Sequence, residues 1–141
     1  MKFPGTYIVR SENETTKLAD WFAEEIKRGD VISVNGKLGT GKTFFIKKVL
    51  ISFGIDTANS PTFAIVNVYS NTIRFYHFDF YRIQNVKELI DIGINDYFAD
   101  SEAITFIEWG NLYREILPQS IIEINIRYKD ENAREFEFKK Y

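Results

Sequence analysis

Residues 36–43, with the sequence GKLGTGKT, have the types and spacing that hold a chain of phosphates. They match the pattern G-x-x-x-x-G-K-[ST], in which glycines let backbone amides approach phosphate oxygens and a following helix adds its positive end. Lys42 supplies a counter-charge to the β- and γ-phosphates, and Thr43 supplies a hydroxyl for Mg²⁺. The pattern therefore predicts a phosphate-binding loop. The other residues predicted to form its cradle are Gly36, Leu38, Gly39, Thr40 and Gly41.

Two carboxylates end apolar runs further along the chain. Asp79 follows the run 75–78, and Glu108 follows the run 104–107. An acid at the end of a buried strand lies at the edge of an α/β sheet where ligands bind, so each is a candidate to hold the metal or to activate water. The alternative for each is a carboxylate that only caps a loop. His77 shares a strand face with Asp79, so it is predicted either to orient Asp79 by a hydrogen bond or to be structural.

The elements that must position these groups follow from hydrophobic periodicity. Ser11 and Glu14 are typical of a capping box at the start of a helix, and Gly29 is a stop signal. Turn residues at 70–72 and 130–132 predict two hairpins. The fold class is α/β, with a central mixed sheet, antiparallel hairpin additions and flanking helices. Helices are predicted at 12–28, 43–53 and from 85, and strands at 31–34, 63–69, 73–79, 103–108, 121–128 and 134–139.

Composition limits the classes of protein. The 141 residues fit one domain, 1–141, with 45% hydrophobic and 16% aromatic residues to fill a core. No cysteine is present, so disulfides and thiolate metal sites are excluded, and one histidine cannot form a His-based zinc site. The net charge of −2 disfavours autonomous binding to DNA or RNA. No apolar run approaches the ~20 residues that cross a membrane, and no signal peptide is recognisable, so a cytoplasmic location is expected.

Four motifs occur in order along the chain: 36–43, NSPTF at 59–63, HFDFYR at 77–82 and FIEWG at 106–110. Together they resemble the TsaE (YjeE) family, small bacterial P-loop ATPases required for threonylcarbamoyladenosine in tRNA. The resemblance covers about residues 10–128. It implies a P-loop NTPase-like domain with ATP and Mg²⁺ as ligands.

The resemblance also implies roles and partners. Thr43 would bind the metal, with Asp79 and Glu108 in the metal shell or activating water. Thr62 would lie in a switch-like segment that senses the γ-phosphate, and Trp109 would be needed beside the catalytic acid. The family acts with TsaB and TsaD, and its ATP hydrolysis resets that transferase pair between turnovers. Contact with tRNA is then expected only through the complex.

Two residues depart from the family pattern. Lys37 stands where an acidic residue is usual, and Phe44 stands where a second small hydroxyl residue is common after Thr43. Phe44 is expected to alter contacts near the α-phosphate, so both departures bear on affinity. Two other functions stay open: a small P-loop kinase, although the arginines form no cluster, and a nucleotide-dependent adaptor without significant hydrolysis. A GTPase is disfavoured because no N-K-x-D sequence follows the loop, and an ABC-type ATPase because no Ser-Gly-Gly signature is present.

Overall fold

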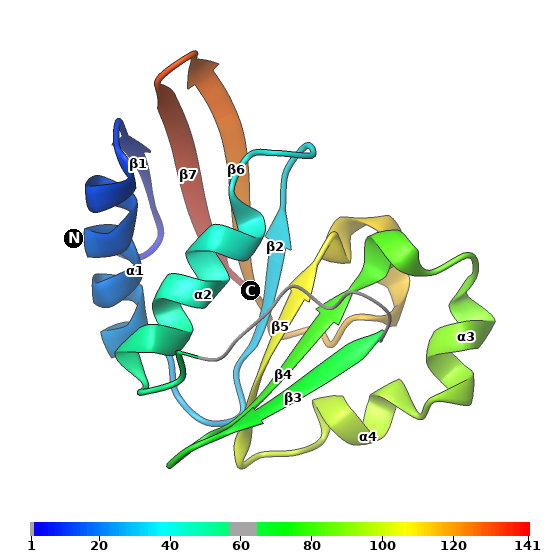
Figure 1. Ribbon diagram of the computed structural model, residues 1–141. Coiled ribbons are helices and arrows are strands. Elements are labelled where there is room, and N and C mark those ends of the chain that lie inside the picture. The colour runs from blue at the N-terminus through cyan, green and yellow to red at the C-terminus, as the bar shows by residue number, and fades with distance from the viewer. Residues whose placement is uncertain (1, 57–64) are drawn as a thin grey trace.

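The computed structural model describes residues 2–56 and 65–141. Within them seven strands form one sheet in the order β1-β7-β6-β2-β5-β4-β3 (Figure 1). Neighbours among β6, β2, β5 and β4 are parallel, whereas β3 at one edge and β7 and β1 at the other are antiparallel to their neighbours. The strands are β1 (Gly5–Val9), β2 (Val31–Asn35), β3 (Val66–Ser70), β4 (Arg74–Asp79), β5 (Ala103–Glu108), β6 (Ile122–Asp130) and β7 (Ala133–Lys140).

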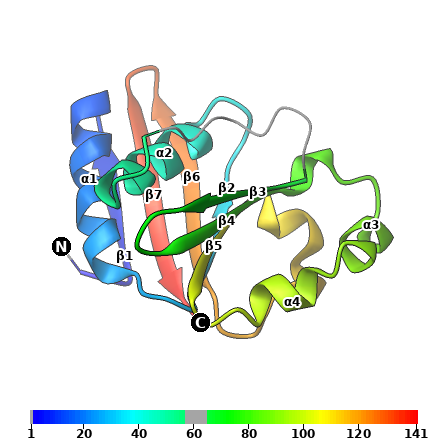
Figure 2. The same cartoon turned by 60° about the horizontal axis from the view of Figure 1, so that its bottom comes forward.

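Helices cover the two faces of this sheet over different strands. On one face α1 (Glu12–Glu25) and α2 (Lys42–Ser52) lie side by side over the half that contains β7 and β6 (Figures 1 and 2). The short helices α3 (Val86–Asp91) and α4 (Ile94–Phe98) and the 3-10 helix η2 (Gly110–Ile116) belong to a second core around β4 and β5. The face of β2, β6 and β7 opposite α1 and α2 therefore carries polar side chains.

Every residue of the central strand β5 is buried. Ile104 and Phe106 belong to the core that α1 and α2 form with the sheet, whereas Ile107 belongs to the second core, with Phe78 and Leu89. A parallel strand with both faces covered is apolar almost throughout, which explains the run before Glu108. The predicted aromatic core is confirmed. Rings stack and tilt against one another between α1, α2 and β7, at Phe22, Phe45, Phe136 and Phe138.

The first helix is shorter than predicted. It ends at Glu25 because Ile26 takes up an extended conformation and is buried, while the Asp30 carboxylate accepts the Lys27 N–H at 2.8 Å and closes a turn. At its start the Ser11 hydroxyl accepts the Glu14 N–H at 3.1 Å, as predicted. The Glu14 carboxylate instead accepts the N–H of Arg10, one residue before the cap.

The predicted mixed sheet and both hairpins are confirmed, although β6 and β7 extend somewhat further than expected. The strand predicted from residue 63 begins outside the described residues, and its visible part is β3. Asn85 caps α3 through a complete capping box. Hydrophobic periodicity did not predict β1, α4 and η2, which are short. No helix in the described residues is long and apolar enough to cross a membrane.

Candidate nucleotide-binding site

The phosphate loop runs from the end of β2 to the start of α2, so the predicted strand and helix on either side of it are confirmed. A Cβ on Gly36 would lie 2.6 Å from the Thr40 hydroxyl and 2.7 Å from the carbonyl oxygen of Ile126, so only glycine fits. Gly41, with φ 101°, turns the chain into α2. Thr40 is buried, and its hydroxyl donates to the carbonyl oxygen of Lys37 at 2.8 Å. These contacts give the loop a defined shape.

Lys42 lies under this loop with only 5% of its surface exposed. Its ammonium donates to the carbonyl oxygens of Gly36 at 2.7 Å and Lys37 at 3.0 Å, and lies 4.3 Å from the centre of the Trp109 ring. Burial lowers the pKa of Lys42, and the nearby carboxylates oppose this shift only in part. Because this ammonium is poorly hydrated, a hydrogen bond to a phosphate oxygen would stabilise it strongly.

Glu108 is the centre of a buried polar cluster. Its carboxylate accepts the Thr43 hydroxyl at 2.8 and 3.0 Å, and His77 Nε2 lies 2.7 Å from the same carboxylate. Of the two alternatives for His77, the hydrogen bond to Asp79 is therefore not formed. His77 and Asp79 do lie on the same face of β4. On that face His77 contacts Glu108, its diagonal neighbour on β5. The other nitrogen of His77, Nδ1, has no partner among the described residues.

Asp79 ends β4 directly opposite Glu108 in the register of the two strands. Its carboxylate accepts the Tyr81 N–H at 3.1 Å and lies 3.4 Å from Arg82 Nε. The loop-capping alternative is therefore realised in this structure. Asp79 nevertheless borders the same cleft as Glu108, within reach of a ligand on the phosphate loop.

An open cleft of about 600 Å³ brings most of the predicted site residues together. Gly36 and Thr40 do not line it; Gly36 packs against Thr40 and Ile126, and Thr40 lines a neighbouring cavity. Thr62 lies outside the described residues. The cleft is lined by Leu38, Gly39, Gly41, Lys42, Thr43, Phe44, Asp79, Tyr81, Arg82, Glu108 and Trp109.

Analysis of the sequence missed three neighbours of the loop. Tyr81 and Arg82 line the cleft, and their place in the 77–82 motif was the available signal. The Tyr128 hydroxyl donates to the carbonyl oxygen of Gly39 at 2.7 Å. Tyr128 lies on the last hairpin, and nothing local in the sequence connects that hairpin with the loop.

A second cavity of about 390 Å³ shares Gly41 and Phe44 with the cleft. Ser11, Glu12 and Thr15 line it from the start of α1, and the turn between β6 and β7 lines the other side. It is large enough for the nucleoside part of a nucleotide whose phosphates occupy the loop.

The oxygen donors at the cleft suit Mg²⁺ only in combination with a ligand. Among the described residues no three His, Cys, Asp or Glu side chains form a metal cluster. The Thr43 hydroxyl and the carboxylates of Glu108 and Asp79 are hard oxygen ligands. Mg²⁺ typically binds one or two carboxylates together with waters and substrate phosphates rather than an all-protein cage. The donor set therefore fits a metal that arrives with a nucleotide.

Comparison with known proteins gives a consistent result. Residues 9–136 match the family model for the threonylcarbamoyl adenosine biosynthesis protein TsaE. The chain is 35% identical to the tRNA threonylcarbamoyladenosine biosynthesis protein TsaE of Rickettsia felis, over 90% of this chain and 75% of the relative. It is 37% identical to the protein of that name from Bacillus subtilis, over 89% of this chain and 78% of the relative. The crystal structure of Bacillus subtilis YdiB superposes with a TM-score of 0.79 at 30% identity, covering 95% of this chain and 83% of that one.

Proposed function

Because the chain belongs to the TsaE family of threonylcarbamoyl adenosine biosynthesis proteins, we propose that it binds and hydrolyses Mg–ATP in support of threonylcarbamoyladenosine formation in tRNA. The observation that carries this proposal is the contact between Thr43 and Glu108. It brings the hydroxyl of a phosphate loop to within 2.8 Å of a buried carboxylate. Phosphate binding alone needs the loop, whereas hydrolysis also needs an acid beside it.

Each side chain has a distinct task in this proposal. The loop amides and Lys42 hold the phosphates, and the second cavity receives the adenosine. Thr43, with Glu108 and Asp79, would hold the metal through oxygen ligands, and the two carboxylates would also orient the attacking water. When bound, Mg²⁺ would neutralise phosphate charge and polarise the terminal phosphoryl group. Trp109 and Phe44 form the walls that limit access of bulk water.

We further propose that hydrolysis serves the TsaB–TsaD pair, resetting that transferase between turnovers, with tRNA reached only through the complex. The net charge of −2 supports this arrangement because it gives the free chain little attraction for a polyanion. A cytoplasmic location is part of the proposal, since tRNA modification takes place there.

The test is steady-state, Mg²⁺-dependent ATP hydrolysis by the protein alone and with the TsaB–TsaD pair of the same organism. We expect slow turnover that rises clearly with the pair and is lost in Lys42→Ala. Transfer of phosphate to an added acceptor would indicate a kinase. Saturable ATP binding with negligible hydrolysis, measured with a pair shown to be active, would indicate an adaptor.

A further inference from the structure

Trp109, directly after Glu108, has an unfavourable backbone conformation. Its φ of 63° and ψ of 32° place it in the left-handed region, and no other non-glycine residue in the described part of the chain has a positive φ. Such a conformation costs on the order of 1–3 kcal/mol and persists only where the surroundings enforce it. The Trp109 ring lies beside the Lys42 ammonium and forms a wall of the cleft. Whatever fixes this turn therefore fixes part of the site.

The turn is held against β2, the strand that leads into the phosphate loop. The Trp109 N–H donates to the carbonyl oxygen of Val34 at 2.9 Å. Gly110 packs on Ser33 so closely that a Cβ on Gly110 would lie 2.1 Å from the serine hydroxyl oxygen. Two consecutive residues of the turn thus contact the strand directly.

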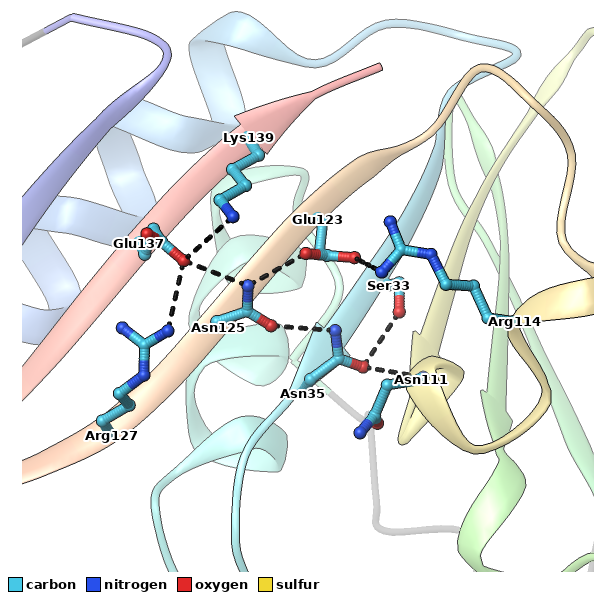
Figure 3. Close-up of polar contacts among 9 residues, drawn as sticks. All are labelled: Ser33, Asn35, Asn111, Arg114, Glu123, Asn125, Arg127, Glu137 and Lys139. Atoms are coloured by element: carbon cyan, nitrogen blue, oxygen red, sulfur yellow. Dashed lines mark hydrogen bonds and ion pairs between the residues drawn. The ribbon is translucent and has the colours of Figure 1, made fainter.

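The third contact comes from the side chain of Asn35, the last residue of β2. Its Oδ1 accepts the backbone N–H of Asn111 at 3.0 Å and the Ser33 hydroxyl at 3.0 Å, and its Nδ2 donates to Asn125 Oδ1 at 3.1 Å (Figure 3). A backbone N–H can only donate, so this contact fixes which amide atom is the oxygen. With 5% of its surface exposed, Asn35 makes three of the four hydrogen bonds that its side chain can form, and both acceptor sites of Oδ1 are used.

The network continues on the open face of the sheet and holds Asn125 in turn. Asn125 Nδ2 donates to the carboxylates of Glu123 at 3.0 Å and Glu137 at 3.2 Å. Glu123 is paired with Arg114, and Glu137 is paired with Arg127 and Lys139 (Figure 3), and all three cations are exposed. The Asn35 amide therefore has one orientation, set by groups that lie on the opposite side of the sheet from α1 and α2.

We propose that Asn35 is a positioning residue that holds the 109–111 turn and thereby keeps the Trp109 ring over Lys42. Asn35 itself does not line the cleft. Its effect on hydrolysis rests on the function proposed above, whereas its effect on Trp109 does not. A merely structural amide would lower stability when removed and leave the indole where it is.

The test uses a Trp21→Phe background, in which Trp109 is the only tryptophan because the chain has two. Trp21 packs against Tyr7 and Phe138, in the core on the α1 side of the sheet. Asn35→Ala is compared with Asn125→Ala, which removes a half-buried amide from the same network but leaves the acceptor for the turn. The measurements without nucleotide are Trp109 emission, its quenching by acrylamide, and thermal unfolding.

We expect Asn35→Ala to shift Trp109 emission to the red and to raise the quenching constant about twofold, with little change in Asn125→Ala. In hydrolysis assays kcat of Asn35→Ala should fall about 10-fold to 100-fold with KM changed less than threefold, since displacement of a site by about 1 Å has effects of this size. Unaltered Trp109 emission in Asn35→Ala, or equal changes in both variants, would overturn the proposal.

A conservative variant covers the case in which Asn35→Ala does not fold. Asn35→Asp keeps an oxygen for the Asn111 N–H, but its second oxygen would face the acceptor Asn125 Oδ1, so it is made in the Asn125→Ala background, where that acceptor is absent. The emission and quenching of Trp109 in this double variant should match those of Asn125→Ala alone. A folded double variant with a displaced indole would refute the positioning role. If the parent does not hydrolyse ATP, the proposed function fails, yet the fluorescence comparison still decides the role of Asn35.

Discussion

Replacing Glu108 by glutamine removes one charge from the site and keeps the shape of the side chain. The glutamine amide can still accept the Thr43 hydroxyl and bond to His77, which contact Glu108 at 2.8 and 2.7 Å. What is lost is the negative charge that, in the proposed function, would face the metal and the attacking water. Glu108→Gln therefore separates the electrostatic role of this residue from its packing.

The expected loss of kcat in Glu108→Gln follows from the burial of Glu108. Glu108 is 5% exposed, so its charge acts through a medium of lower effective dielectric than water. Removing one such electrostatic contact from a catalytic site typically costs about 10²–10³-fold in kcat, or about 3–4 kcal/mol. The free energy of unfolding should change by less than about 1.5 kcal/mol, because the hydrogen bonds are kept and a buried charge is removed.

The chain offers a matched control in Glu123, which is also buried, at 6% exposure, on a strand next to β2 but outside the cleft. Glu123→Gln keeps the acceptor for Asn125 and loses only the ion pair with Arg114. We expect its hydrolysis to match the wild type and its stability to fall by about 1 kcal/mol or less.

The assay measures kcat and KM for Mg–ATP together with equilibrium binding of a fluorescent ATP analogue. The affinity of Glu108→Gln for the analogue should be within about threefold of wild type, while its kcat should fall about 10²–10³-fold. A kcat within threefold of wild type, with the control behaving as expected, would show that the Glu108 charge does not take part in hydrolysis.

Three further substitutions probe the loop. Lys42→Met should weaken binding of the ATP analogue at least tenfold and raise the melting temperature. Burial lowers the pKa of Lys42, so the unfolded chain binds the Lys42 proton more tightly than the folded protein does. The free energy of unfolding of the wild type should therefore rise with pH between that lowered pKa and the usual 10.5. This rise should be absent in Lys42→Met. Gly36→Ala should lower both binding and the melting temperature, because its Cβ meets backbone at 2.7 Å; unchanged calorimetric values would contradict the geometry. Tyr128→Phe removes the hydrogen bond to Gly39, so titration should show affinity reduced about twofold to fivefold, or about 0.5–1 kcal/mol, whereas wild-type affinity would make that contact incidental.

Local pattern was enough to predict the phosphate loop and its flanking elements, because the motif itself specifies a strand, a turn and a helix. The apolar runs before Asp79 and Glu108 likewise predicted strand ends, and the structure pairs the two acids in register. Periodicity says which residues end strands. It does not say which strands become neighbours.

Because the order and register of the strands are unknown from periodicity, several contacts at the site could not be predicted. The partner of His77 could not be deduced, because a diagonal contact between two strands depends on their register and not on spacing within one of them. The contact of Tyr128 with Gly39 joins residues 89 positions apart, and that of Asn35 with Asn125 joins residues 90 apart. Buried polar side chains have no periodic signal of their own, so their partners emerge only from the assembled sheet.

The hydrogen bond between Thr43 and Glu108 separates the tasks of the two acids. A hydroxyl has one proton and two lone pairs. When Thr43 donates its proton to Glu108, both lone pairs of the hydroxyl stay available on the cleft side, so in the proposed function Glu108 would orient Thr43 toward the metal rather than compete with it. Asp79 has no such contact and is instead held by the Tyr81 N–H and Arg82. Loss of the charge at Glu108 should therefore lower kcat with little effect on nucleotide affinity, whereas loss of the carboxylate at Asp79 should also free the loop that it caps.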